Sequence, residues 1–152
     1  MKKFLTAICA AALLITGCSD NSQATSAEVK EAVPMKNSVT IQINGKNFSA
    51  TLEDNPTARA FAEKFPLEAE ATELNGNEKY FYLDADLPSD AVNVKQIHAG
   101  DLMLFGSNCV VLFYKDFATG YSYTRLGKLD NPADLAKTLG AGNVRIAFAK
   151  GA

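Results

Sequence analysis

The sequence has little of the material from which metal sites and catalytic centres are usually built. It contains a single histidine, His98, and its three cysteines form no Cys-x-x-Cys pair, so the spacing typical of a zinc site is missing. The net charge is −2 and the three arginines lie far apart, without the basic patch that a nucleic-acid-binding protein needs. We therefore expect no metal, no cofactor and no nucleic-acid partner.

The N-terminus has the layout of an export signal. A basic start, "MKK", precedes the apolar run "FLTAICAAALLI", which is too short to span a membrane as a mature helix. The run leads to Ile15-Thr16-Gly17-Cys18, which resembles the bacterial lipobox, a signal that is cut just before its cysteine. The resemblance implies that residues 1–17 are a lipoprotein signal peptide and that Cys18 carries lipid. The alternative is an ordinary signal peptide in which Cys18 occurs by chance.

Residues 18–38 are expected to form the lipidated cysteine and a tether. The segment is polar, rich in Ala, Ser and Glu, and has no apolar periodicity, which predicts a flexible chain with a reach of roughly 25 Å. Two or more acyl chains anchor a protein stably to a membrane. We expect a lipid-anchored protein of the cell envelope. Ser19 stands where an aspartate would be an inner-membrane retention signal, which favours the outer membrane, facing the periplasm, in a Gram-negative cell.

The remaining residues, 39–150, are enough for one domain, which we expect to be monomeric. Cys109 is the only cysteine left in this range, so the domain has no internal disulfide. Because Cys109 begins the apolar run "CVVLFY", a buried and inert thiol is favoured over a nucleophile.

Hydrophobic alternation and turn signals divide residues 39–150 into short strands and two helices. Asn44-Gly45 and Asn75-Gly76 predict tight turns between alternating runs. Asn55-Pro56 and Asn131-Pro132 predict helix starts. The resulting order is two strands, a helix, five strands, a helix and one strand, with a polar loop at residues 84–98. Closely spaced short strands indicate a mainly β barrel or sandwich, and each helix has one apolar face to cover an end of it.

Several stretches resemble a bacterial family of small cyclophilin-like proteins: "ATLEDNPTARAFAEKFPL", "ELNGNEKYFYL", "IHAGDLMLFGSNCVVLFYKDF" and "YSYTRLGKLDNP". The resemblance covers residues 39–149 and implies a closed eight-stranded β-barrel with two short capping helices. Cyclophilins catalyse peptidyl-prolyl isomerisation with an arginine on the strand after the first helix. The corresponding strand here, "LEAEATEL", has no arginine and an acidic polar face. We therefore expect a non-catalytic module that binds a peptide or a small anionic molecule. The alternatives are an isomerase or another enzyme, and a purely structural envelope protein.

The first group of candidate ligand-binding residues lies on the strand predicted in "YSYTRLGKL". Tyr121, Tyr123 and Arg125 alternate along one strand and so share a face. Aromatic rings beside a guanidinium suit an anionic or aromatic ligand. The commoner arrangement is an outward barrel surface on which Arg125 pairs with an acid.

The second group is Tyr80 and Tyr82, on the strand face opposite Phe81 and Leu83. Phe81 and Leu83 are the better core pair, because buried phenolic hydroxyls need a hydrogen-bonding partner. The two tyrosines are therefore expected to face outward, either into a groove or onto plain surface.

The third candidate is His98, close in sequence to Asp101 in "IHAGD". A histidine beside a carboxylate could act as a general base. The alternative is a loop histidine that is hydrogen-bonded to backbone.

Overall fold

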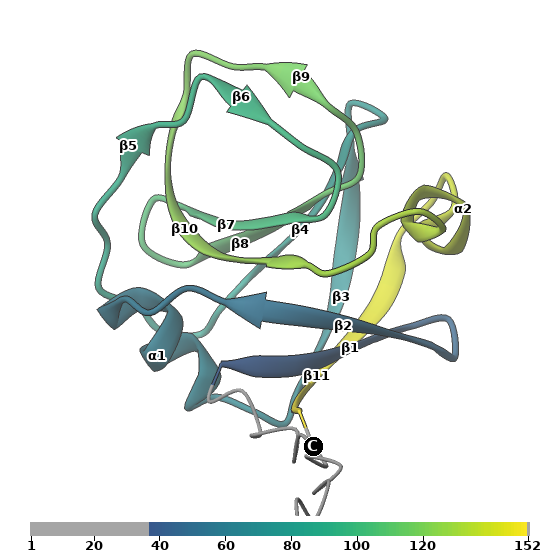
Figure 1. Ribbon diagram of the computed structural model, residues 1–152, viewed down its shortest axis with the longest axis horizontal. Helices are drawn as coiled ribbons and strands as arrows, with labels where there is room; N and C mark the ends of the chain where they lie inside the picture. The colour runs from purple at the N-terminus through teal and green to yellow at the C-terminus, as the bar shows by residue number, and fades with distance from the viewer. Residues whose placement is uncertain (1–36, 152) are drawn as a thin grey trace, which may run out of the picture. The chain divides into compact units, whose positions relative to one another are not determined.

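Eight antiparallel strands close into a barrel in the computed structural model, which describes residues 37–151 (Figure 1). Neighbouring strands follow the order β2-β1-β11-β3-β4-β8-β7-β10, and β10 pairs back onto β2 to complete the circle. The strands are β1 (Ser38–Ile43), β2 (Lys46–Leu52), β3 (Leu67–Leu74), β4 (Glu78–Tyr82), β7 (Asp101–Phe105), β8 (Cys109–Phe113), β10 (Ser122–Leu129) and β11 (Val144–Lys150). The predicted mainly β, closed eight-stranded barrel is confirmed.

Three further strands of two residues each were not predicted from the sequence. β5 (Val92–Asn93) pairs with β10, while β6 (Gln96–Ile97) and β9 (Phe117–Ala118) pair with each other in a separate small sheet. Two residues are too few to show an alternating pattern, so the sequence predicts only a loop at residues 84–98. In Figure 1, β6 and β9 lie above β7 and β8, on the side away from β1 and β2.

The two Asn-Gly turns form as predicted. Asn44 and Gly45 have φ of 48° and 77° and join β1 to β2, and Asn75 and Gly76 have φ of 55° and 68° and join β3 to β4. Positive φ at both positions is what a type I′ turn requires, and asparagine tolerates it better than other side chains do. The first turn is a two-residue hairpin between the paired Ile43 and Lys46, whereas three residues separate the paired Leu74 and Glu78.

Helix α1 (Pro56–Ala62) begins where the sequence predicts. The Asn55 Oδ1 accepts the backbone N–H of Ala58 at 2.8 Å, and Pro56 occupies the first turn. The buried side chains of Ala58 and Phe61 join the core inside the barrel. This is the N-capping arrangement that favours a helix start, since the cap satisfies an N–H without an intrahelical partner.

Helix α2 (Leu135–Leu139) begins later than Asn131-Pro132 predicts. The Asn131 Oδ1 accepts the N–H of Ala133 at 3.1 Å, and the Leu135 N–H donates to the Pro132 carbonyl at 2.9 Å. These bonds close a turn before the helix, so the asparagine initiates the turn and not α2 itself. Figure 1 shows α1 and α2 at opposite sides of the barrel, and the two buried leucines of α2 belong to the same core as α1.

Both faces of β8, and of β7 as far as Leu104, are buried, which positions the site described below. Leu104 and Val110 point into the barrel core, whereas Met103, Cys109 and Val111 belong to a second apolar cluster on the outer face. Strands that are covered on both sides carry continuous apolar runs in place of alternation, which explains "CVVLFY". The cover consists of residues from the β5–β6 and β9 region, including Ile97 and Phe117.

The predicted signal peptide, residues 1–17, and all but the last two residues of the predicted tether, 18–38, lie outside the described residues. Within residues 37–151, no helix has the length and apolar character needed to cross a bilayer.

Candidate functional site

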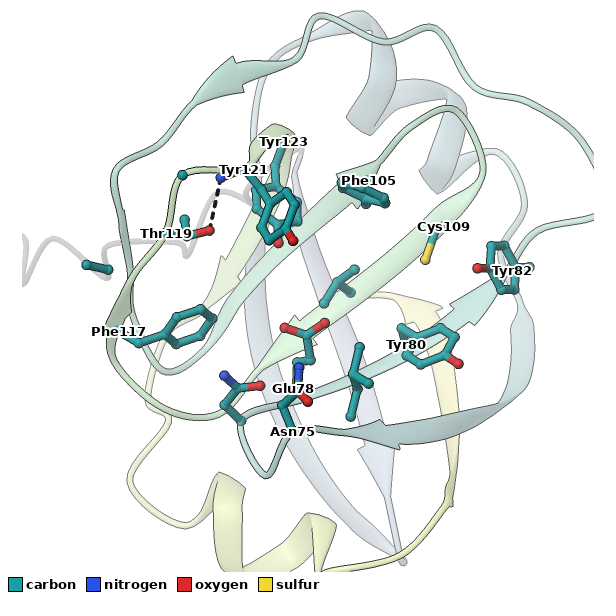
Figure 2. Close-up of a pocket in the computed structure, with 15 residues that line it drawn as sticks. Asn75, Glu78, Tyr80, Tyr82, Phe105, Cys109, Phe117, Thr119, Tyr121 and Tyr123 are labelled. Carbon is teal, nitrogen blue, oxygen red and sulfur yellow. Dashed lines mark hydrogen bonds between the residues drawn. The ribbon is translucent and has the colours of Figure 1, made fainter.

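A pocket of about 530 Å³ opens on the outer wall of the barrel (Figure 2). One side is made by outward-facing residues of β4, β7 and β8 together with the β3–β4 turn. The other side is the segment 117–121, which contains β9 and leads into β10. Its size falls in the range of ordinary small-ligand or side-chain pockets.

Six aromatic side chains line this pocket. They are Tyr80, Tyr82, Phe105, Phe117, Tyr121 and Tyr123. Tyr80 and Tyr82 form an edge-to-face pair with ring centroids 5.8 Å apart, and Phe105 lies 6.1 Å from Tyr121 and 5.6 Å from Tyr123. Figure 2 shows these two aromatic groups on different sides of the pocket. The pocket therefore offers several ring faces to a bound group.

The segment 117–121 is held against the barrel by specific contacts. Phe117 packs against Phe113 with ring centroids 5.7 Å apart. The Thr119 N–H donates to the Lys95 carbonyl at 2.9 Å, and the Thr119 hydroxyl accepts the Tyr121 N–H at 3.1 Å. These contacts fix the position of this wall of the pocket.

The four tyrosines predicted as ligand candidates all line this one pocket. On β4, Phe81 faces the core while Tyr80 and Tyr82 face outward, as the alternation predicts. Tyr123 is buried at the base of the pocket, whereas Tyr121 is exposed at the rim. From the sequence, these two pairs of tyrosines are predicted as separate groups of candidates. The strand order brings them together, because only β8 and β7 separate β4 from β10.

Arg125 does not share the pocket with Tyr121 and Tyr123. It is exposed on β10, where a register shift between Arg125 and Gly127 interrupts the pairing with β7. Among the described residues, the ion pairs do not include Arg125, so the acidic partner considered from the sequence is not found there.

His98 also lies outside the pocket. Its side chain is 63 % exposed, and its Nδ1 is 3.9 Å from Asp101 Oδ2. The same carboxylate oxygen accepts the backbone N–H of His98 at 2.9 Å. Asp101 is buried and holds the turn before β7. The arrangement matches a loop residue hydrogen-bonded through its backbone.

Glu78 is the charged residue of the pocket lining and is not among the candidates predicted from the sequence. Figure 2 shows its carboxylate between Phe117 and Tyr80. Among residues 37–151 no side-chain hydrogen bond or ion pair reaches this carboxylate. Burial, followed by the negative charge of Glu73, raises the pKa of Glu78. The alternation of "EKYFY" was the available signal, because it places Glu78 on the same face as Tyr80 and Tyr82.

Cys109 and Asn77 complete the polar lining. Burial, followed by the charge of Glu78, raises the pKa of the Cys109 thiol, so the thiol stays protonated at neutral pH. This agrees with the inert cysteine expected from the sequence. The Oδ1 of Asn77 is buried and has no hydrogen-bond partner among the described residues. Within the same residues, no cluster of three or more His, Cys, Asp and Glu side chains could hold a metal ion.

Fold and site together define a small closed barrel with an aromatic pocket on its outer wall. The model of the cyclophilin-like family matches residues 41–149, and the chain belongs to this family. The predicted family resemblance is confirmed.

A search of curated proteins finds no match. Among solved structures, the chain is similar to the solution structure of a hypothetical protein from Archaeoglobus fulgidus. The two chains share 17 % identity with a TM-score of 0.58, over 75 % of this chain and 94 % of the other. At this identity the likeness concerns the fold.

Proposed function

We propose that this chain is a cell-envelope lipoprotein whose barrel binds a peptide segment in the aromatic pocket without catalysing a reaction. The observation that carries the proposal is the distribution of exposed apolar side chains. Large apolar side chains that are at least 40 % exposed in the described residues are Leu74, Tyr82, Val92, Phe105 and Tyr121. All except Val92 line the pocket. Apolar surface concentrated around one hollow is typical of an interaction site.

A peptide fits the pocket better than a compact metabolite does. Tyr82, Phe105 and Tyr121 are exposed at its margin, so they can contact a chain that continues beyond the pocket. Tyrosine combines a large apolar ring with a hydroxyl that can donate to or accept from a peptide backbone, and it is enriched in binding interfaces for this reason.

A binding role is favoured over isomerase activity by the charges around the pocket. Twisting a prolyl bond is helped by a cationic donor to the peptide, yet the pocket lining contains no arginine, lysine or histidine. Arg145 of β11 is the arginine beside β3, where its Nη1 lies 3.9 Å from the exposed carboxylate of Glu68. It does not line the pocket.

The anchoring part of the proposal is supported by the lipobox-like Ile15–Cys18 and the polar segment that follows it. Lipid on Cys18 would hold the barrel at a membrane, in the outer membrane facing the periplasm in a Gram-negative cell. A tether of this length would let the pocket meet segments of other envelope proteins within roughly 25 Å of the surface.

Selection of heptapeptides from a phage-displayed random library with the full chain tests the binding function. We expect enriched sequences whose binding falls at least tenfold in Tyr121→Ala, because this exposed ring contributes to the pocket and little to the core. Val92→Ala is the matched control, since Val92 is similarly exposed but lies outside the pocket. Equal losses in the two variants, or no enrichment at all, would contradict the proposal.

A further inference from the structure

The pocket contains a charge that the protein itself leaves unpaired. Glu78 is half-buried, and no side-chain donor among the described residues reaches its carboxylate. A partly buried carboxylate without a counter-ion is energetically costly, because it has lost water without gaining a partner. The cost would be removed by a ligand that brings a positive charge.

The groups facing Glu78 do not neutralise it. Burial, followed by the charge of Glu78, raises the pKa of Tyr123 on β10 and of Cys109 on β8. They are therefore uncharged at neutral pH. Glu73 from β3 lies on the inner face of the barrel with Lys79 as its counter-ion, and its charge raises the pKa of Glu78 further.

The lysine next to Glu78 on β4 is already hydrogen-bonded on the other side of the strand. Lys79 points to the opposite side of the strand, where it is fully buried and bonded to Glu73 and to the carbonyl oxygens of Gly140 and Gly142. It cannot reach into the pocket without breaking those bonds. Lys115, whose Nζ lies 4.0 Å from a Cβ built at Gly76 in the β3–β4 turn, makes no ion pair with Glu78 among the described residues. A ligand can therefore supply the positive charge that Glu78 lacks.

The remaining lining also suits a cation that carries several N–H donors. The buried Oδ1 of Asn77 is an acceptor without a donor. The rings of Tyr80 and Phe117 lie on either side of the Glu78 carboxylate, with Tyr82 further along the pocket, and ring faces carry negative electrostatic potential (Figure 2). An ammonium or guanidinium group is attracted both to ring faces and to a carboxylate. An anionic ligand would meet the charge of Glu78 and no compensating base.

We infer that the pocket selects an organic cation, the ammonium or guanidinium group of a lysine or arginine side chain in the bound peptide, with Glu78 as its counter-ion and the surrounding aromatic rings as its cage. The inference rests on the proposed peptide-binding function and specifies which side chain anchors the peptide. It replaces the small anionic ligand considered from the sequence, which relied on Arg125.

Titration of the isotope-labelled full chain with capped pentapeptides tests the inference. The peptides have the sequence Gly-Ala-X-Ala-Gly, where X is lysine, arginine, norleucine or glutamate, and NMR shifts of the Gly120 and Tyr121 amides report binding. We expect lysine and arginine peptides to bind at least tenfold more tightly than the norleucine peptide. Norleucine is the appropriate reference because it keeps the apolar stem of lysine and lacks only the charge.

Glu78→Gln should reduce this preference to less than about twofold and leave norleucine binding unchanged, because it removes the charge and keeps the shape. Glu53→Gln is the matched control: it makes the same change in net charge at an exposed residue outside the pocket and should preserve the preference. The melting temperature of Glu78→Gln should be no lower than that of the parent, which separates lost recognition from unfolding.

The outcomes separate the inference from the proposed function. Equal binding of lysine and norleucine peptides would overturn cation selection while leaving peptide binding intact. Absence of any shift with all four peptides would overturn both. Titration with n-butylammonium tests whether the cation must belong to a peptide. Binding as tight as that of the lysine peptide supports the cation site but contradicts a peptide ligand. Weaker binding supports both the cation site and the peptide ligand.

Discussion

At the scale of single residues, Lys79 shows how a charge is accommodated inside the barrel. It lies on the inner face of β4, and its ammonium group donates to the Glu73 carboxylate, to the Gly140 carbonyl at 2.8 Å and to the Gly142 carbonyl at 2.6 Å. These bonds use all three of its donors. The Tyr114 hydroxyl donates to the same carboxylate at 2.9 Å. The network fastens the loop between α2 and β11 to the β3–β4 hairpin.

We predict that Lys79→Met lowers the free energy of unfolding by about 3–5 kcal/mol, because it leaves Glu73 without its counter-ion and removes the donor to the Gly140 and Gly142 carbonyls. Chemical denaturation followed by circular dichroism measures the loss. Lys128→Met, at an exposed position of β10, is the control and should change stability by less than about 0.5 kcal/mol. A loss in Lys79→Met no larger than that of the control would show that the network contributes nothing.

Glu73 should also make the barrel sensitive to acid. Burial alone would raise the pKa of Glu73, but hydrogen bonds from Lys79, Tyr114 and the Gly76 N–H outweigh it and lower the pKa below its ordinary value of 4.5. A carboxyl whose pKa is lower in the folded state contributes stability above its unfolded pKa and loses it as the pH falls through the folded pKa.

We therefore predict that the free energy of unfolding decreases as the pH falls below about 5, and that the decrease is shallower in Glu73→Gln. Denaturant titrations across this range measure both slopes. Glu70→Gln, at an exposed position on β3, serves as the control and should keep the slope of the parent. An identical slope in Glu73→Gln and the parent would assign the acid sensitivity to other carboxyls.

At the scale of elements, closure of the barrel depends on a close approach between β10 and β2. A Cβ atom added at Gly127 would lie 2.4 Å from the Thr51 carbonyl oxygen and 2.8 Å from the Leu52 Cα. Gly127 pairs with Leu52 and follows the register shift of β10. The glycine is thus needed for space, since any side chain would push the two strands apart where they complete the barrel.

We predict that Gly127→Ala destabilises the protein by about 1–3 kcal/mol, the usual range for a forced overpacking. Thermal or chemical unfolding measures the change. Gly142→Ala is the control, because a Cβ there would have no neighbour within 4 Å among the described residues. Stability equal to that of the parent would mean that β2 and β10 can separate at this point without cost.

At the scale of the whole molecule, the proposed anchor and the pocket are encoded in separate parts of the chain. The lipobox-like motif ends at Cys18, and the first barrel strand begins at Ser38. Membrane attachment should therefore be removable without loss of the barrel.

We predict that Cys18→Ser abolishes incorporation of labelled fatty acid and moves the protein from the membrane fraction to the soluble fraction, because the thiol is the site of lipid attachment. Cys9→Ser, within the apolar run of the predicted signal peptide, is the matched control and should keep both labelling and membrane association. Persistent labelling of Cys18→Ser would show that the lipobox interpretation is wrong.

The sequence by itself determined the elements of the barrel and the family. Alternation assigned Phe81 to the core and Tyr80 to the outer face, and Asn44-Gly45 placed a hairpin, because strand periodicity and positive-φ turns are local properties. The start of α2 was misplaced because an asparagine can initiate either a turn or a helix.

The tertiary structure alone decided the composition of the pocket. An alternating pattern says on which face of its own strand a residue lies, but not which strand is adjacent or what covers that face. Strand order brought Tyr80 beside the segment that carries Tyr121, and it left Arg125 outside. The same closure placed a neighbouring base and acid in opposite surroundings: Lys79 lies inside with three acceptors, and Glu78 lies outside with no side-chain donor among the described residues. Their environments are set by atoms distant in sequence, because burial and charge pairing depend on contacts made only when the barrel closes.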